Sequence, residues 1–85
     1  MAQLIERRAL EFTIESTEKL DDPQEFLGLQ NAGRSDFVLY WLNEEEGDYE
    51  FASGVPDSEA ELIESAIDYM VERWGYDREK LSARN

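Results

Sequence analysis

The side chains of this sequence that could carry out chemistry are almost all carboxylic acids. Its 85 residues include 21 Asp and Glu against 8 Lys and Arg, with no His and no Cys. Without imidazole or thiol groups, the chain lacks the usual base of a serine enzyme, the nucleophile of a cysteine enzyme and the soft ligands of zinc. It also has no glycine motif for phosphate. We therefore predict no catalytic residues, no metal site and no cofactor.

Two groups of acids stand out by their spacing. Five recur every three or four residues, which on a helix of about 100° per residue confines them to a band about 80° wide. These are Asp57, Glu61, Glu64, Asp68 and Glu72. Five more surround one turn: Glu44, Glu45, Glu46, Asp48 and Glu50. The turn lacks the ligand spacing of an EF-hand loop, so we predict a solvated turn and no calcium site. All ten acids are predicted partner-binding residues.

The sign of the charge narrows the class of partner. The formal net charge is −13, and residues 35–72 contain twelve acids and no base. This argues against direct binding to nucleic acid or to an anionic membrane, because both need a basic protein surface. We expect a small non-enzymatic interaction protein, an inhibitor or regulator, that docks on a basic protein surface. A narrower hypothesis is mimicry of nucleic acid, with a nucleic-acid-binding protein as the partner.

Aromatic and basic residues complete this hypothesis. The acids would steer the partner by electrostatic attraction, and exposed rings near Tyr40, Trp41 or Tyr49 would add affinity. The bases of residues 73–85 are expected to pair with the acidic helix of a neighbouring molecule.

The clearest predicted elements lie in the second half of the chain. Apolar residues from Leu62 onward recur at the helix period, Ser58 begins a capping box, and a glycine follows Trp74, so we predict a helix over Glu59–Trp74. Before it, Asp36–Asn43 and Asp48–Ser53 predict a β-hairpin joined by an acidic turn.

The first third of the chain predicts a strand and a short helix. Alternating apolar and polar residues predict a strand over Ala9–Ser16, in competition with a helix over Leu4–Phe12. Asp22 followed by proline resembles a helix start, so we predict a short helix over Pro23–Gln30, although Gly28 is unfavourable there.

Together these elements predict a small α+β domain with the order β-α-β-β-α. Its three-stranded, mainly antiparallel sheet would be packed by the long C-terminal helix. Residues 1–76 would form the single domain, and residues 77–85 a frayed or short helical tail. The longest apolar run has six residues, too few for a signal peptide or a membrane span, so the expected location is the cytoplasm.

An alternative function is a structural homodimer whose acidity serves only solubility or life at high salt. The strand expected over Asp36–Asn43 has two apolar faces, with Phe37, Leu39 and Trp41 on one and Val38, Tyr40 and Leu42 on the other. Both faces need cover. The long helix would cover one, and either the short helix or a second copy of the chain would cover the other.

Overall fold

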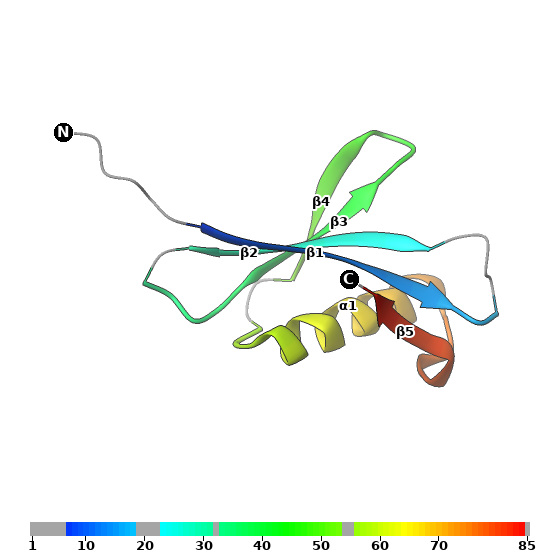
Figure 1. Ribbon diagram of the computed structural model, residues 1–85. Helices are drawn as coiled ribbons and strands as arrows, with labels where there is room; N and C mark the ends of the chain where they lie inside the picture. Colours follow the sequence, from blue (N-terminus) through cyan, green and yellow to red (C-terminus); the bar gives the residue numbers. More distant parts are fainter. Residues whose placement is uncertain (1–6, 19–22, 32, 54–55, 85) are drawn as a thin grey trace.

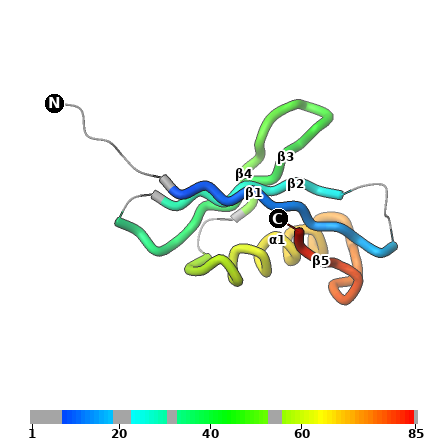
Figure 2. The backbone as a smooth tube through the Cα atoms, viewed as in Figure 1, coloured from blue at the N-terminus to red at the C-terminus, as the bar shows by residue number. Residues whose placement is uncertain are grey.

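The computed structural model describes residues 7–18, 23–31, 33–53 and 56–84. These residues form five strands, one α-helix and one 3-10 turn (Figure 1). In chain order the elements are β1 (Arg7–Ser16), β2 (Gln24–Asn31), β3 (Val38–Asn43), β4 (Asp48–Ser53), α1 (Glu59–Trp74), η1 (Arg78–Lys80) and β5 (Leu81–Arg84). All strands join one antiparallel sheet in the order β4-β3-β2-β1-β5. The helix lies against one face of this sheet (Figure 2). Together with η1 it connects β4, at one edge of the sheet, to β5 at the opposite edge.

The expected α+β class is confirmed, but the β-α-β-β-α order with a three-stranded sheet is wrong. The segment predicted as a short helix over Pro23–Gln30 is instead strand β2, between β1 and β3. Phe26 and Gly28 are buried while Leu27 and Leu29 are half-buried, so the side chains alternate with the period of a strand. Because one of the buried positions is occupied by Gly28, the alternation does not appear in the pattern of apolar residues. Asp22, the expected helix cap, lies outside the described residues.

The C-terminal residues add a further strand to the expected sheet. Asp77 caps the 3-10 turn by accepting a hydrogen bond from the backbone N–H of Glu79 at 3.1 Å. The next four residues form β5, which pairs with β1 and places Ala83 opposite Ile14. Leu81 is buried in the core. Four residues are too few to show a periodic pattern, so the sequence alone does not predict this strand. Only its pairing with β1, which is distant in the sequence, identifies it as a strand.

Three predicted elements are confirmed. The helix has the predicted bounds: Ser58 Oγ accepts a hydrogen bond from the N–H of Glu61 at 3.2 Å, and Gly75 ends the helix with a φ of 72°. The β3–β4 hairpin turns at Gly47, whose φ is 69° and whose N–H donates to the carbonyl of Asn43 at 2.8 Å. Residues 7–16 form a strand, and residues 4–6 of the competing helix lie outside the described part. None of the described helical segments is both long enough and apolar enough to cross a membrane.

The hydrophobic core lies between α1 and the sheet face that it covers. From the sheet it contains Phe12, Ile14, Phe26, Leu39, Trp41 and Leu81, and from the helix Leu62, Ala66, Ile67 and Met70. The helix approaches β2 closely at Gly28, where an added Cβ would lie 2.9 Å from Cδ1 of Leu62. Because β2 is a strand within the sheet, it leaves the opposite face uncovered by any described element.

Candidate functional site

Aromatic rings gather where the C-terminal end of α1 meets β3. Trp41 lies 5.0 Å from Trp74 and 6.1 Å from Tyr69, measured between ring centroids. Trp74 in turn lies 5.6 Å from Tyr69 and 6.3 Å from Tyr76, with the rings nearly perpendicular. Edge-to-face pairs of this kind are favourable because the positive edge of one ring meets the negative face of the other. Trp41 and Tyr76 are buried, whereas Trp74 is 37% exposed, so the cluster presents one tryptophan to solvent.

Arg73 places a positive charge on this aromatic cluster. Its guanidinium carbon lies 4.9 Å from the ring centroid of Trp41 and 5.5 Å from that of Trp74, which is the range of a cation–π interaction. Its Nη1 donates a hydrogen bond to the hydroxyl of Tyr69 at 2.8 Å. The carboxylate of Glu50 is 3.8 Å from Nη2. These rings therefore already hold one cation of the chain itself.

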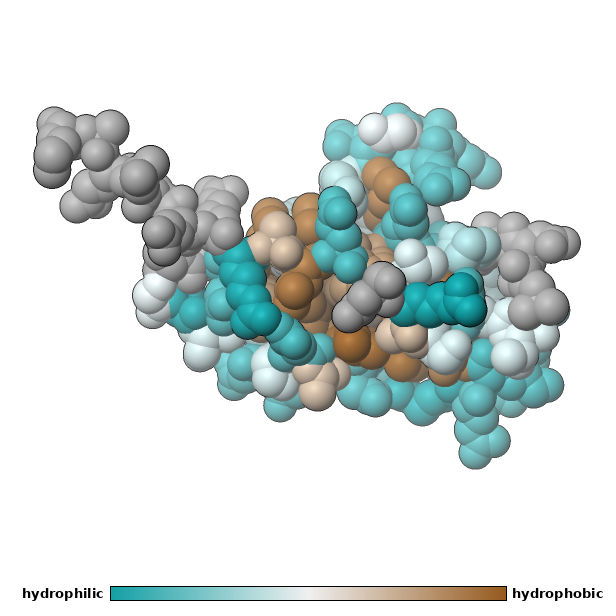
Figure 3. All heavy atoms as spheres, in the orientation of Figure 1, coloured by the Kyte–Doolittle hydropathy of each residue, from teal (hydrophilic) through white to brown (hydrophobic). Residues whose placement is uncertain are grey.

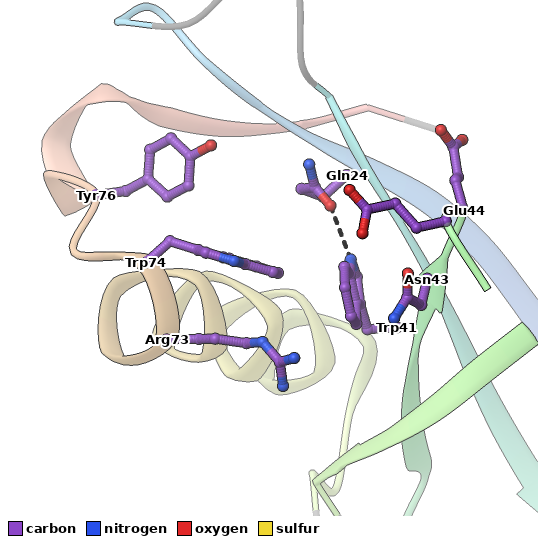
Figure 4. Close-up of a pocket in the computed structure, with 8 residues that line it drawn as sticks. Gln24, Trp41, Asn43, Glu44, Arg73, Trp74 and Tyr76 are labelled. Carbon is purple, nitrogen blue, oxygen red and sulfur yellow. Dashed lines mark hydrogen bonds between the residues drawn. The ribbon is translucent and has the colours of Figure 1, made fainter.

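A hollow of about 420 Å³ opens beside the cluster, between the end of α1 and the β3–β4 turn (Figure 4). Its walls are the rings of Trp41, Trp74 and Tyr76, the guanidinium of Arg73, the amides of Gln24 and Asn43, and the carboxylates of Glu44 and Glu45. Trp41 Nε1 donates a hydrogen bond to Oε1 of Gln24 at 2.8 Å, which fixes the edge of the indole. The hollow thus has aromatic surface on the helix side and two carboxylates on the turn side. We name it, with these eight residues, the acidic–aromatic site.

The β3–β4 turn brings three of the predicted acids together. Glu44, Glu45 and Glu46 are exposed, and none of them forms an ion pair with another described residue. Asp48 is also exposed, and its Oδ1 accepts a hydrogen bond from the N–H of Tyr49 at 2.8 Å. The turn therefore presents an uncompensated patch of negative charge at the mouth of the hollow.

Glu50 differs from its neighbours in the turn. Its carboxylate accepts a hydrogen bond from the side-chain amide of Asn43 and lies near Arg73. This residue therefore contributes to holding β3, β4 and α1 together, beneath the exposed turn.

The five predicted acids of the helix do not form a continuous line of free charge. Arg78 from η1 donates to Oε2 of Glu64 at 2.9 Å and also pairs with Asp68. At the start of the helix, Glu61 accepts a hydrogen bond from the backbone N–H of Asp57 at 2.8 Å. Arg78 therefore pairs with the helix of its own chain. The sequence had led us to expect pairing with the helix of a neighbouring molecule.

Glu72 directly precedes Arg73 in the last turn of α1. It is exposed, and with Tyr69 and Ala52 it lines a separate hollow of about 240 Å³. No ion pair joins it to any residue within the described ranges. Glu44, Glu45 and Glu72 therefore line hollows that aromatic rings also line, and none of the three has an ion pair with a described residue.

Sequence reasoning finds only part of this site. It selects the acids of the turn and names Trp41 among the aromatic residues that could add affinity. Tyr40 and Tyr49, the other two, lie on the opposite face of the sheet. Trp74 and Arg73 are missed, because from the sequence Trp74 belongs to the apolar side of the helix and nothing local places it against β3.

Within the described ranges, no group of three or more His, Cys, Asp or Glu side chains is placed to hold a metal ion. No protein-family model matches the chain, and neither a curated protein nor a solved structure matches it. What the acidic–aromatic site offers is a set of ring faces and carboxylates that complements a cationic side chain.

Proposed function

We propose that this chain is a non-enzymatic interaction protein, an inhibitor or regulator, that docks on a basic protein surface through the acidic–aromatic site. The observation that carries the proposal is the meeting of unpaired turn carboxylates and an exposed tryptophan at one hollow. Tryptophan and arginine dominate the binding energy of many protein interfaces when they lie at the centre of a contact. An arginine or lysine of the partner, entering the hollow, would meet the aromatic rings and the carboxylates of Glu44 and Glu45 beside the guanidinium of Arg73.

Electrostatics supports the same partner at long range. A net charge of −13 raises the rate at which a basic protein reaches this surface. Carboxylates at the solvent boundary interact with a cation 4 Å away by about 1 to 4 kcal/mol, depending on how far water is excluded. Arg73 supports the choice of ligand, because it shows how a guanidinium stacks on these rings.

The ion pairs of the helix place the proposed contact at its C-terminal end. Arg78 compensates Glu64 and Asp68 in the middle of α1, so the line of charge that mimicry of nucleic acid would use is interrupted. We therefore propose a basic protein surface in general and make no use of mimicry. The proposed setting is the cytoplasm, in keeping with the sequence.

Two variants of equal net charge test the location of the site. Replacing Glu44, Glu45 and Glu46 with glutamine changes the net charge from −13 to −10. Replacing Glu11, Glu25 and Glu79, which are exposed and lie outside the site, makes the same change. With an arginine-rich peptide as the probe, we expect the turn variant to lose about tenfold in affinity at low salt and the matched variant less than about twofold. Trp74→Ala should increase the dissociation rate of the peptide.

The comparison between the two triple variants decides the proposal. Equal losses would mean that only net charge matters and that the acids serve solubility. The same pair of variants applies to any basic protein that the chain retains from a cytoplasmic extract of its host. If neither the turn variant nor added salt changed the binding affinity, the proposed docking site would be wrong.

A further inference from the structure

The sheet face opposite α1 carries an apolar patch that no described element covers. Register places on this face Leu27 and Leu29 of β2, Val38, Tyr40 and Leu42 of β3, and Phe51 of β4, with Tyr49 beside them. Phe51 is 64% exposed and Tyr49 is 40% exposed. The others are half-buried. Figure 3 shows apolar atoms reaching the surface at the level of the sheet, with hydrophilic atoms around them. We name these seven residues the open-face patch.

Cross-strand pairing makes the patch continuous. Leu29 lies opposite Val38, Leu27 opposite Tyr40, and Tyr40 opposite Phe51. The rings of Tyr40 and Phe51 are 6.3 Å apart at an interplanar angle of 83°. Residues paired in this way lie about 5 Å from one another across the strands. A contiguous apolar surface of this kind marks an interaction site in soluble proteins.

The chemistry of the face excludes the basic partner proposed for the other side. The seven residues of the patch carry no charge; on the same face Glu25 of β2 lies at the border of the patch, and the other charges lie on β1 and β5. Arg84 and Glu15 there already pair with each other, with 3.2 Å between Nε and Oε2. A partner for the patch must therefore be apolar and must leave one side of the sheet face in water.

A second copy of the chain satisfies both conditions. The patch is centred on β3, with leucines of β2 on one side and aromatic residues of β4 on the other. A two-fold axis along β3 places β2 of each copy over β4 of the other, so that Leu27 and Leu29 meet Phe51 across the interface. The charged residues of β1 and β5 then lie beyond the partner's β4 edge, in solvent. The patch is thus complementary to itself.

Size and charge are both compatible with this contact. The three strands of the patch offer on the order of 300 Å² of flat area per copy before side-chain relief is counted, less than the ~800 Å² per partner of a standard interface, so we expect a weak dimer. Sheets that pack face to face lie about 10 Å apart, so the two outward-facing helices would be about 30 Å apart. That distance is several times the screening length of about 8 Å at physiological salt. Repulsion between the acidic surfaces therefore does not prevent association.

We propose that two copies of this chain pack face to face through the open-face patch, forming a two-layer sandwich with α1 on each outer side. The acidic–aromatic site remains free in this dimer, because it lies on the α1 side of the sheet. Salt should act on the two associations in opposite directions. Screening relieves repulsion between two acidic copies and strengthens the dimer, whereas it weakens attraction to a basic partner.

Sedimentation of the full chain over a range of about 1 to 100 µM tests the dimer. We expect twice the monomer mass of 9.9 kDa, with tighter association at about 1 M salt than at about 0.05 M. Phe51→Glu should raise the dimer dissociation constant at least 30-fold, while circular dichroism shows a retained fold because Phe51 is largely exposed. Leu27→Glu should act in the same way. The matched control is Ala60→Glu, which adds the same charge on an exposed position of α1 and should leave the dimer unchanged.

Cross-linking tests the predicted axis. The chain has no cysteine, so Tyr40→Cys introduces a single thiol near the axis and Ser82→Cys one far from it. A short bismaleimide should link copies of the first variant and leave the second monomeric on a denaturing gel. A monomer at all concentrations and both salt levels would overturn the proposal. A dimer that survives both glutamate substitutions would overturn it as well, since its interface would lie elsewhere.

Discussion

Replacing Gly28 tests the packing of the sheet against the helix. In Gly28→Ala, the new Cβ would lie 2.9 Å from Cδ1 of Leu62 and closer still to Cδ2, whereas carbon atoms normally pack at about 3.5–4.0 Å. Leu62 is only 1% exposed, so its side chain cannot move aside into solvent without leaving the core. Overpacking of this kind costs about 1–3 kcal/mol. The smaller conformational freedom of alanine in the unfolded chain offsets about 0.4–1 kcal/mol of that cost.

A double-mutant cycle isolates this contact. Leu62→Ala alone should cost about 2–5 kcal/mol because it opens a cavity in the core. In that background the methyl group of Gly28→Ala meets no leucine and fills part of the space, so its cost should vanish. The coupling energy between the two positions is then about 1–3 kcal/mol. Guanidinium unfolding followed by tryptophan fluorescence measures each free energy, at one fixed chain concentration because association shifts apparent stability.

An equal cost of Gly28→Ala in both backgrounds would refute the packing of β2 beneath α1. Leu29→Ala provides the matched control, since it lies on the same strand but on the other face of the sheet. We expect its effect to be additive with that of Leu62→Ala within about 0.5 kcal/mol.

Three further predictions concern local interactions. Arg34 donates a hydrogen bond to Asp36 at 2.9 Å and lowers the pKa of that carboxyl group. The pair therefore stabilises the fold above the ordinary pKa of aspartate, and this contribution is lost as the pH falls through the lowered pKa. Arg34→Gln should raise the pKa of Asp36 in an NMR titration. Gly75→Ala places a side chain at a φ of 72° and should cost about 1 kcal/mol of unfolding free energy. Arg73→Gln removes the guanidinium 4.9 Å from the Trp41 ring, which should cost about 0.5–1 kcal/mol and shift tryptophan emission; an unchanged spectrum would contradict the stacking.

The parts of the fold that sequence reasoning predicts correctly are those specified by adjacent residues. Ser58 and Gly75 bound the helix by capping, and Gly47 marks the hairpin turn, because each acts within one turn of chain. Strand β2 is not specified by adjacent residues in this way. The proline after Asp22 resembles a helix start, and the reason for Gly28 is visible only when Leu62 lies over it.

The candidate site divides in the same way. The acids of the turn are recognisable from the sequence because they are consecutive and belong to a predicted hairpin. The pairing of Arg78 with Glu64 depends on the direction in which η1 leaves the helix. The contact of Trp74 with Trp41 depends on how α1 crosses the sheet, and neither follows from spacing along the chain.

The position of β5 in the sheet has a consequence for folding during synthesis. Strands β1 to β4 form a meander of neighbouring contacts, whereas β5 joins β1 with Leu81 opposite Ser16, across most of the described chain. Contacts between such distant segments form slowly, because the intervening chain must first be ordered. Until residues 81–84 leave the ribosome, β1 therefore has an unpaired backbone edge, which is the kind of edge that recruits other strands into aggregates. Pairing with β5 covers this edge of β1 at residues 13–16, whereas residues 7–12 keep an outer edge that no described strand covers.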